Sequence, residues 1–95
     1  METDYFMLHL GFNNYVVANK IMAIAGYNTA PTKRLVKICK ERGMCIDATE
    51  GRKTKTVIVL QDGYLALSFF DRTTLAKRYN DGIIEKMRGD KKWIK

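Results

Sequence analysis

The dipeptide Asp62-Gly63 constrains the fold more strongly than any other part of the sequence. It lies, with Gln61 before it, between two β-rich runs, residues 56–60 and 64–69. Asp-Gly between such runs is the strongest short-range signal for a hairpin. We therefore predict two neighbouring antiparallel strands, which commits the second half of the chain to a sheet.

Shorter apolar runs predict four more strands, at residues 6–10, 15–17, 21–24 and 44–46. The first two are separated by Gly11-Phe12-Asn13-Asn14. We place the turn at Asn13-Asn14, because asparagine tolerates positive φ better than most residues.

A helix is predicted over about residues 30–42. Thr29 is the expected N-cap, and Pro31 suits the first helical turn because its missing N–H would have no partner there. Gly43 is expected to end the helix in the left-handed conformation. Lys33 and Arg34 lie near the start of this helix, where the helix dipole disfavours positive charge. This unfavourable placement indicates a functional role for the two cations.

A second helix is predicted from residue 72, with Asp71 as its N-cap. Its apolar residues fall on one stripe at i, i+4 spacing, namely Leu75, Tyr79, Ile83 and Met87. Gly82 costs the helix about 1 kcal/mol relative to alanine and marks where it could break. Residues 91–95 are expected to form a frayed basic tail.

The order β-β-β-α-β-β-β-α predicts one small α+β domain with a mostly antiparallel sheet. Residues 1–71 form its β-rich part with one helix, and residues 72–95 add the C-terminal helix and basic tail of the same domain. So few elements leave the apolar stripe of the last helix partly uncovered. We therefore expect this helix to pack against another copy of the chain, forming a homo-oligomer.

Positive charge is concentrated in two parts of the chain. The net charge is +7, and residues 33–55 and 72–95 each carry eight cations against three acids. This distribution favours an electrostatic binding surface for nucleic acid or for another anionic surface. No apolar run approaches the ~20 residues that span a bilayer, and the N-terminus is acidic, so we expect a cytoplasmic protein without membrane or secretion signals.

The segment Gly51-Arg52-Lys53-Thr54-Lys55 carries three cations in four positions. Since it lies between the strands at 44–46 and 57–60, it reads as the tip of a hairpin. Cations and the hydroxyl of Thr54 both bind phosphate oxygens. The loop is therefore the first candidate site for a polyanion.

The sequence offers little for catalysis. It contains no phosphate-loop, dinucleotide-binding or zinc-protease motif, and Cys39, Cys45 and His9 fall short of a zinc ligand set. The thiols are expected to be buried and structural, and Asp47 to bond its own backbone at Thr49 or Gly51. We predict no enzyme activity, no cofactor, no metal and no small-molecule substrate.

From Leu8 to Arg78 the chain resembles the RemA family of small bacterial DNA-binding regulators of biofilm-matrix genes. The resemblance runs through several segments in order and at the family's spacing. They are Leu10–Asn14, Ala18–Lys20, Ala30–Arg34, Ile46–Lys55, Leu67-Ser68 and Thr74–Arg78.

The resemblance implies ring-shaped homo-oligomers that bind and wrap double-stranded DNA. It places DNA-contacting cations at Arg52 and Lys53, with Lys20 and Lys55 as further matching positions. Three departures stand out: Asn13 replaces a glycine, lysines replace family arginines, and Glu50 replaces a residue that is commonly aromatic. Lysine keeps the charge but loses the planar fork of arginine.

We therefore predict a transcription regulator that binds double-stranded DNA as an oligomer at the nucleoid. The candidate contacts are Arg52, Lys53, Lys55, Lys20, Lys33, Arg34 and Thr54. Two alternatives remain open. One is an RNA-binding protein whose aromatics Phe12, Tyr15, Tyr64 and Phe69 stack on bases, although core packing explains these rings more simply. The other is a scaffold module whose basic face binds an acidic protein.

Overall fold

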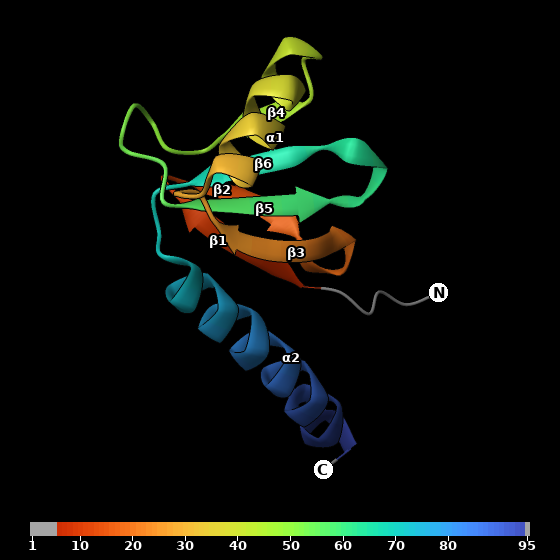
Figure 1. Ribbon diagram of the computed structural model, residues 1–95. Helices are drawn as coiled ribbons and strands as arrows, with labels where there is room; N and C mark the ends of the chain where they lie inside the picture. The colour runs from red at the N-terminus through yellow and green to blue at the C-terminus, as the bar shows by residue number, and fades with distance from the viewer. Residues whose placement is uncertain (1–5, 95) are drawn as a thin grey trace.

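The computed structural model describes the backbone of residues 6–94 and the side chains of residues 6–85. The elements are β1 (Met7–Gly11), β2 (Asn14–Val17), η1 (Ala18–Lys20), β3 (Ile21–Gly26), α1 (Ala30–Glu41), β4 (Cys45–Asp47), β5 (Thr56–Leu60), η2 (Gln61–Gly63), β6 (Leu65–Ser68) and α2 (Arg72–Ile94). Apart from the two single 3₁₀ turns, η1 and η2, this is the predicted order (Figure 1). The fold class, a small α+β domain, is confirmed.

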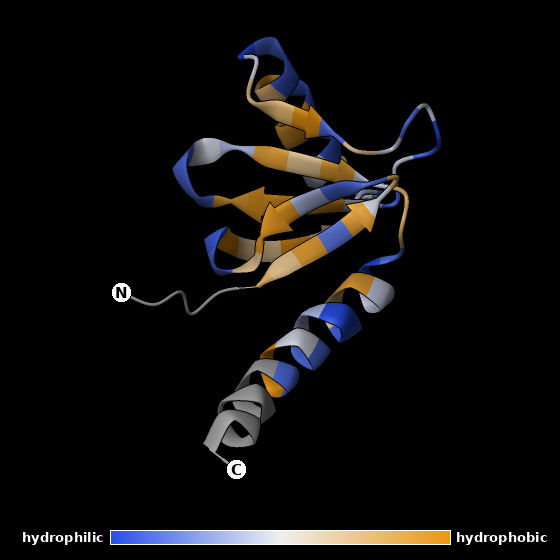
Figure 2. Cartoon of the chain, turned by 180° about the vertical axis from the view of Figure 1, so that it is seen from behind, coloured by the Kyte–Doolittle hydropathy of each residue, from blue (hydrophilic) through white to orange (hydrophobic). Residues whose placement is uncertain are grey.

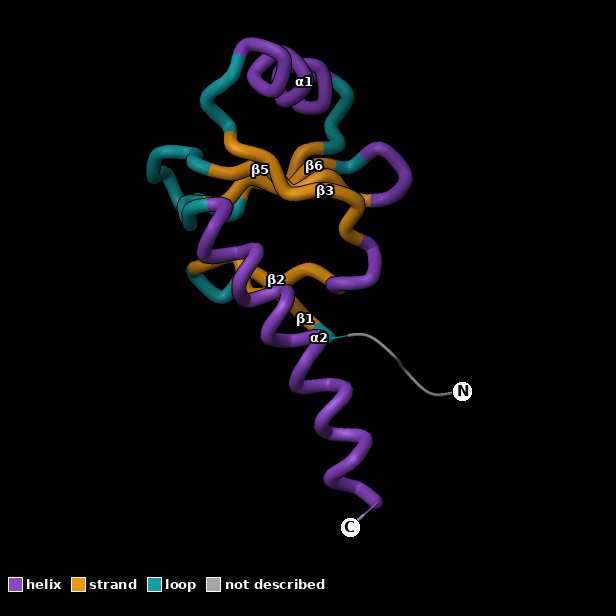
Figure 3. The backbone as a smooth tube through the Cα atoms, turned by 60° about the horizontal axis from the view of Figure 1, so that its bottom comes forward, coloured by secondary structure: helices purple, strands orange, loops and turns teal. Residues whose placement is uncertain are grey.

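The molecule has three layers. The central layer is a four-stranded sheet in the order β3-β5-β6-β4, and β1 and β2 form a separate antiparallel hairpin. Figure 3 shows α1 above the four-stranded sheet and the hairpin below it. The helix α2 contacts β1 and β3 and then runs away from the sheet (Figure 1).

Side chains of β5 alternate between the two faces of the central sheet, as the two-residue period of a strand requires. Val57 and Val59 face α1 with Val36 and Leu67, while Ile58 and Leu60 face the hairpin with Leu8. Because both faces are covered, the two central strands read as nearly continuous apolar runs (Figure 2).

The Asp-Gly hairpin is confirmed. Strands β5 and β6 pair antiparallel with Val57 opposite Leu67 and Val59 opposite Leu65. Asp62 adopts a φ of 68° in the turn between them. Asp62 and the following glycine thus supply the positive φ values that reverse the chain.

The predicted hairpin at residues 44–60 is wrong. Strand β4 pairs with β6 in parallel, Cys45 opposite Leu65 and Asp47 opposite Leu67, so β6 lies between β4 and β5. Residues 48–55 therefore form a crossover loop past the end of β6 rather than a hairpin tip. The prediction assumed that β4 and β5 pair because they are adjacent in sequence. The tight β5–β6 turn instead places β6 on one edge of β5, and β3 lies on the other edge.

The first turn is shifted by one residue from its predicted place. The central turn residues are Phe12 and Asn13, with φ of 52° and 65°, and Asn14 begins β2. The Asn14 side chain donates hydrogen bonds to the carbonyl oxygens of Gly11 and Phe12, at 3.1 and 3.2 Å. Asparagine thus stabilises the turn from its edge, while a phenylalanine takes a conformation that bulky residues rarely adopt.

Helix α1 begins as predicted. Thr29 is extended, and its hydroxyl oxygen accepts a hydrogen bond from the Thr32 N–H at 3.3 Å. Gly43 follows the helix with a φ of 72°, the left-handed conformation expected of it.

Helix α2 passes through Gly82 without a break and continues to Ile94, so residues 91–94 are helical rather than frayed. A Cβ atom at position 82 would overlap the ring of Phe6, which also packs against Tyr79. Along the predicted stripe Leu75 is buried, whereas Ile83 is exposed; Met87 lies outside the described side chains.

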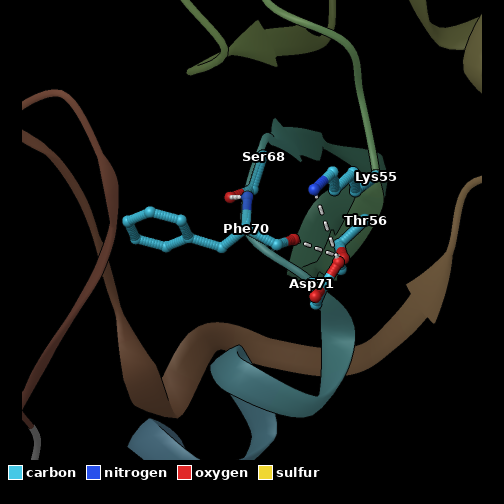
Figure 4. Close-up of polar contacts among 5 residues, drawn as sticks. All are labelled: Lys55, Thr56, Ser68, Phe70 and Asp71. Carbon is cyan, nitrogen blue, oxygen red and sulfur yellow. Dashed lines mark hydrogen bonds and ion pairs between the residues drawn. The ribbon is translucent and has the colours of Figure 1, made fainter.

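Two buried hydroxyls tie the layers together beside the loop. Ser68, on β6, donates to the Leu10 carbonyl at 2.8 Å and accepts from the Phe70 N–H at 3.1 Å. Thr56, on β5, donates to the Phe70 carbonyl at 2.7 Å (Figure 4). These bonds hold the β1–β2 hairpin and the start of α2 against the end of the central sheet.

Candidate nucleic-acid interface

The cationic loop, residues Gly51–Lys55, is part of the crossover loop 48–55, which is held by backbone hydrogen bonds at both of its ends. The Ala48 N–H donates to the Leu67 carbonyl at 3.0 Å, and the Lys55 N–H donates to the Ser68 carbonyl at 2.9 Å. Between them the Arg52 N–H closes a turn on the Thr49 carbonyl at 2.9 Å. The loop backbone is therefore anchored along β6, and its charged side chains extend from fixed backbone positions.

Asp47 stabilises the entry to the loop. Its Oδ1 accepts hydrogen bonds from the Thr49 N–H at 2.9 Å and the Thr49 hydroxyl at 2.6 Å, which confirms the predicted side-chain turn. These bonds favour the ionised carboxylate and lower the pKa of Asp47 below its usual range. The carboxylate is thus engaged in holding the loop.

The tip of the loop reverses direction through two residues with positive φ, Glu50 at 51° and Gly51 at 81°. Glycine suits the second position because residues with a Cβ rarely adopt this positive φ. Crowding is not the reason, since no atom lies within 4 Å of where a Cβ would be. The Glu50 carbonyl accepts a 3.4 Å hydrogen bond from Arg52 Nη1.

Arg52 lies over an aromatic ring. Its guanidinium carbon is 4.5 Å from the centroid of Phe12, a residue that is 39% exposed at the strained turn of the β1–β2 hairpin. Strain at an exposed aromatic residue is typical of a functional position. The ring holds the guanidinium in place without neutralising it.

Lys55 has a second ring and a carboxylate beside it. Its Nζ is 4.7 Å from the centroid of the Phe69 ring. The same Nζ lies 3.8 Å from Asp71 Oδ1 (Figure 4). Phe69 in turn lies 6.4 Å from Phe12, centroid to centroid. Arg52, the two rings and Lys55 therefore form one connected row on the surface.

Lys33, Lys53 and Thr54 meet across a pocket of about 470 Å³. Tyr27, Lys55 and Asp71 also line the pocket, and Lys33 Nζ lies 5.7 Å from the centroid of the Tyr27 ring. Helix α1 thus brings one predicted cation to the loop. Placing Lys33 near the helix start is unfavourable for the helix dipole but favourable for a shared anion site.

Lys20 and Arg34 are not part of this group. Lys20 precedes β3, whose Ile21 pairs with Leu60, whereas Lys55 precedes Thr56, which pairs with Gly26. The two lysines therefore lie at opposite ends of the β3–β5 pair, about 20 Å apart along the strands. Arg34 is exposed but follows Lys33 by one position, about 100° around α1, and does not line the pocket.

Sequence reasoning misjudged three of the four aromatic residues that it considered for base stacking. Core packing was the simpler expectation for Phe12, Tyr15 and Tyr64, but all three are exposed, and only Phe69 is partly buried. The signal for Phe12 was its place next to a turn, where its ring meets the loop from a distant part of the chain. Nothing local in the sequence pairs Phe12 with Arg52.

Two other kinds of feature are missing from the described residues. No group of three histidine, cysteine or acidic side chains among them could hold a metal ion. Within the same residues, no helix is long and apolar enough to cross a membrane. The site is thus an anchored surface loop with three cations, two of them over aromatic rings.

The fold and the site define a small α+β domain that presents a cationic surface loop. Residues 7–79 match the family described as RemA-like, extracellular matrix regulatory protein A-like. The chain belongs to this family.

Relatives from several bacteria carry names that begin "Putative regulatory protein". One from Acetivibrio thermocellus is 38% identical over 84 residues, covering 88% of this chain and 90% of that protein. One from Desulfatibacillum aliphaticivorans is 44% identical, covering 77% and 82%, and one from Gloeothece citriformis is 40% identical, covering 80% and 86%. These names describe regulators rather than enzymes.

Proposed function

We propose that this protein is a transcription regulator that binds double-stranded DNA as a homo-oligomer, with phosphate contacts from the cationic loop. The observation that carries the proposal is the row formed by Arg52 and Lys55 over Phe12 and Phe69. The rings orient the cations while leaving their charge available to an external anion. The family description supports regulation of extracellular-matrix genes as the cellular role.

One loop by itself binds weakly. Each phosphate neutralised adds about −0.9 to the slope of log affinity against log salt on duplex DNA, so three cations give only a shallow dependence. Repetition of the loop around an assembly multiplies these contacts and raises the effective concentration of each loop at the DNA. An oligomer is therefore part of the proposed mechanism.

Two apolar surfaces at opposite edges of the central sheet support the oligomer. At one edge Ile21, Met22, Ile24 and Tyr79 line a shallow pocket, and Met22 is 68% exposed. At the other edge Ile46 of β4 is exposed, as are Leu35 and Ile38 on α1, which lies against β4. We call these the β3 face and the β4 face.

Two different faces at opposite edges fit head-to-tail contact, in which the β3 face of one copy meets the β4 face of the next. Such heterologous contacts close into a ring when the rotation between copies allows it. Ile83 and Ile84 are exposed further along α2 and extend the apolar surface beyond Tyr79. The expected role of the C-terminal helix in assembly is thus part of this proposal.

The test is a DNA mobility shift across a salt series with the double variant Arg52→Ala, Lys53→Ala. We expect loss of the shift at physiological salt and a shallower salt slope, with the native mass unchanged. The matched control is Lys37→Ala with Arg42→Ala, which removes the same two residue types from a position on α1 and from its C-cap, neither of which lines the loop pocket. If the loop variant binds as the wild type does, the site assignment is wrong.

A competition in the same assay separates the alternatives. Excess single-stranded RNA that displaces the duplex more effectively than unlabelled duplex would favour an RNA-binding protein. Failure to bind any nucleic acid above physiological salt would favour an acidic protein partner. Preference for duplex DNA, with a steep dependence on salt, is the outcome that we expect.

A further inference from the structure

The pocket beside the cationic loop is lined by cations and by other residues that the phosphates of duplex DNA would not contact. It lies between the β3–α1 connection, the loop and the start of α2, and is lined by Tyr27, Asn28, Lys33, Lys53, Lys55 and Asp71. Its volume of about 470 Å³ falls in the usual range for small-molecule sites. A phosphate group alone would leave most of it empty.

Three ammonium groups at the pocket supply the anion-binding part. Lys53 and Lys55 come from the loop, and Lys33 comes from α1 on the other side. Thr54 adds a hydroxyl between the two loop lysines. Opposed to these is one carboxylate, Asp71, whose oxygen is 3.8 Å from Lys55, longer than a hydrogen bond. The pocket therefore has an excess of positive charge for a phosphate or diphosphate group.

The remaining walls suit a nucleoside. Tyr27 is half-buried and packs against the core cluster under α1, so its ring is held in place. A base that stacks on this ring takes the space in which Lys33 Nζ lies, 5.7 Å from the ring centroid. Asn28 offers an amide that both donates and accepts hydrogen bonds, as the edge of a base requires. The Asp71 carboxylate can accept hydrogen bonds from ribose hydroxyls.

Duplex DNA cannot place a base against Tyr27 and Asn28, because its bases stay stacked inside the double helix while its phosphates contact the protein surface. A free nucleotide uses both the cations and the ring. We infer that the pocket binds a nucleoside phosphate and that this ligand competes with DNA for Lys53 and Lys55. The competition rests on the proposed function, whereas nucleotide binding itself does not.

The first measurement is calorimetric titration of the full-length protein with adenosine and guanosine 5′-diphosphate, and separately with inorganic pyrophosphate. We expect at least one nucleotide to bind at least about fivefold more tightly than pyrophosphate, because stacking of a base on an aromatic ring contributes that much. Equal affinities would mean simple attraction of anions and would overturn the inference.

Two variants locate the site. Lys33→Ala should weaken nucleotide binding about tenfold through loss of a charged contact, while Lys37→Ala, one turn further along α1, should leave it unchanged. Tyr27→Leu keeps an apolar side chain against the core and should bring nucleotide affinity down to that of pyrophosphate. Equal effects of the two lysine variants would contradict the assignment.

The second measurement is displacement of a labelled duplex by the nucleotide. We expect the nucleotide to displace the duplex at concentrations that match its affinity from calorimetry. Nucleotide binding without displacement would overturn the inference that the ligand competes with DNA. Arg52→Ala separates this idea from the proposed function, since Arg52 does not line the pocket. It should weaken DNA binding and leave nucleotide affinity unchanged. A protein that binds nucleotide but not DNA would contradict the proposed function alone.

Discussion

Gly82 is a residue whose role depends on a contact made far away in the sequence. It lies inside α2, where alanine ordinarily stabilises an exposed helix by about 1 kcal/mol over glycine. Here the ring of Phe6 occupies the space that a Cβ would fill, and Phe6 also packs against Tyr79 at 5.6 Å between centroids. The glycine thus allows the residue before β1 to close over α2.

We predict that Gly82→Ala fails to stabilise the protein and does stabilise the Phe6→Ala variant, by about 1 kcal/mol. The reason is that the smaller residue at position 6 removes the overlap and leaves the helix propensity of alanine. Urea unfolding of the four proteins in the cycle measures the coupling. A gain of the same size in both backgrounds would mean that Phe6 does not restrict position 82.

Local chemistry around single residues was predictable where the partner lies a few positions away. Thr29 caps α1, Asp47 binds Thr49, and Gly43 ends its helix, each as its residue type requires. Phe12 and Gly82 were not predictable in this way. Their partners, Arg52 and Phe6, are brought to them only by the tertiary fold.

At the scale of elements, the loop between β4 and β5 depends on β6. Its ends bond to Leu67 and Ser68, so a strand that follows the loop in sequence fixes the path of the loop in space. The expected hairpin would have placed the same cations at a free tip. The crossover instead brings them beside Phe12, Phe69 and Lys33, which a free tip would not reach.

Glu50 is the acid within this loop, and its charge opposes an approaching phosphate. We predict that Glu50→Gln raises DNA affinity about twofold at physiological salt, the size typical of one exposed charge interaction. Mobility shifts at several salt concentrations measure this, and the gain should shrink as salt rises. Glu41→Gln, at the end of α1, is the control for net charge. An equal gain from both variants would show a general charge effect rather than one at the loop.

At the scale of the whole molecule, the two apolar faces predict how copies meet. In the proposed head-to-tail contact, Met22→Glu removes the β3 face and Ile46→Glu removes the β4 face, and each variant alone should be monomeric. A mixture of the two should form a heterodimer and nothing larger, because each partner keeps one intact face. Native mass measurement of the separate and mixed variants gives the answer.

This mixing experiment distinguishes a head-to-tail contact from a symmetric contact of one face with itself. In a symmetric contact of one face with itself, one variant would stay oligomeric and the mixture would gain nothing. Circular dichroism of each variant controls for folding, and Met22 and Ile46 are both exposed enough to accept a charge without entering the core. Full rings formed by either single variant would contradict the head-to-tail arrangement.

The sequence by itself determined the elements and their order. Apolar runs, Asp62-Gly63 and the helix caps are read over a few residues, and their conformations depend on neighbours within that distance. It also determined the family and the basic character of the loop. These features do not depend on which strand lies beside which.

The tertiary structure alone decided the parallel pairing of β4 with β6, the platform of Phe12 under Arg52, and the convergence of Lys33 with Lys53. It also separated Lys20 from the loop by the length of β3. Each of these contacts joins segments distant in sequence, and burial of both faces of the central sheet selects among the possible pairings. No local pattern carries that information.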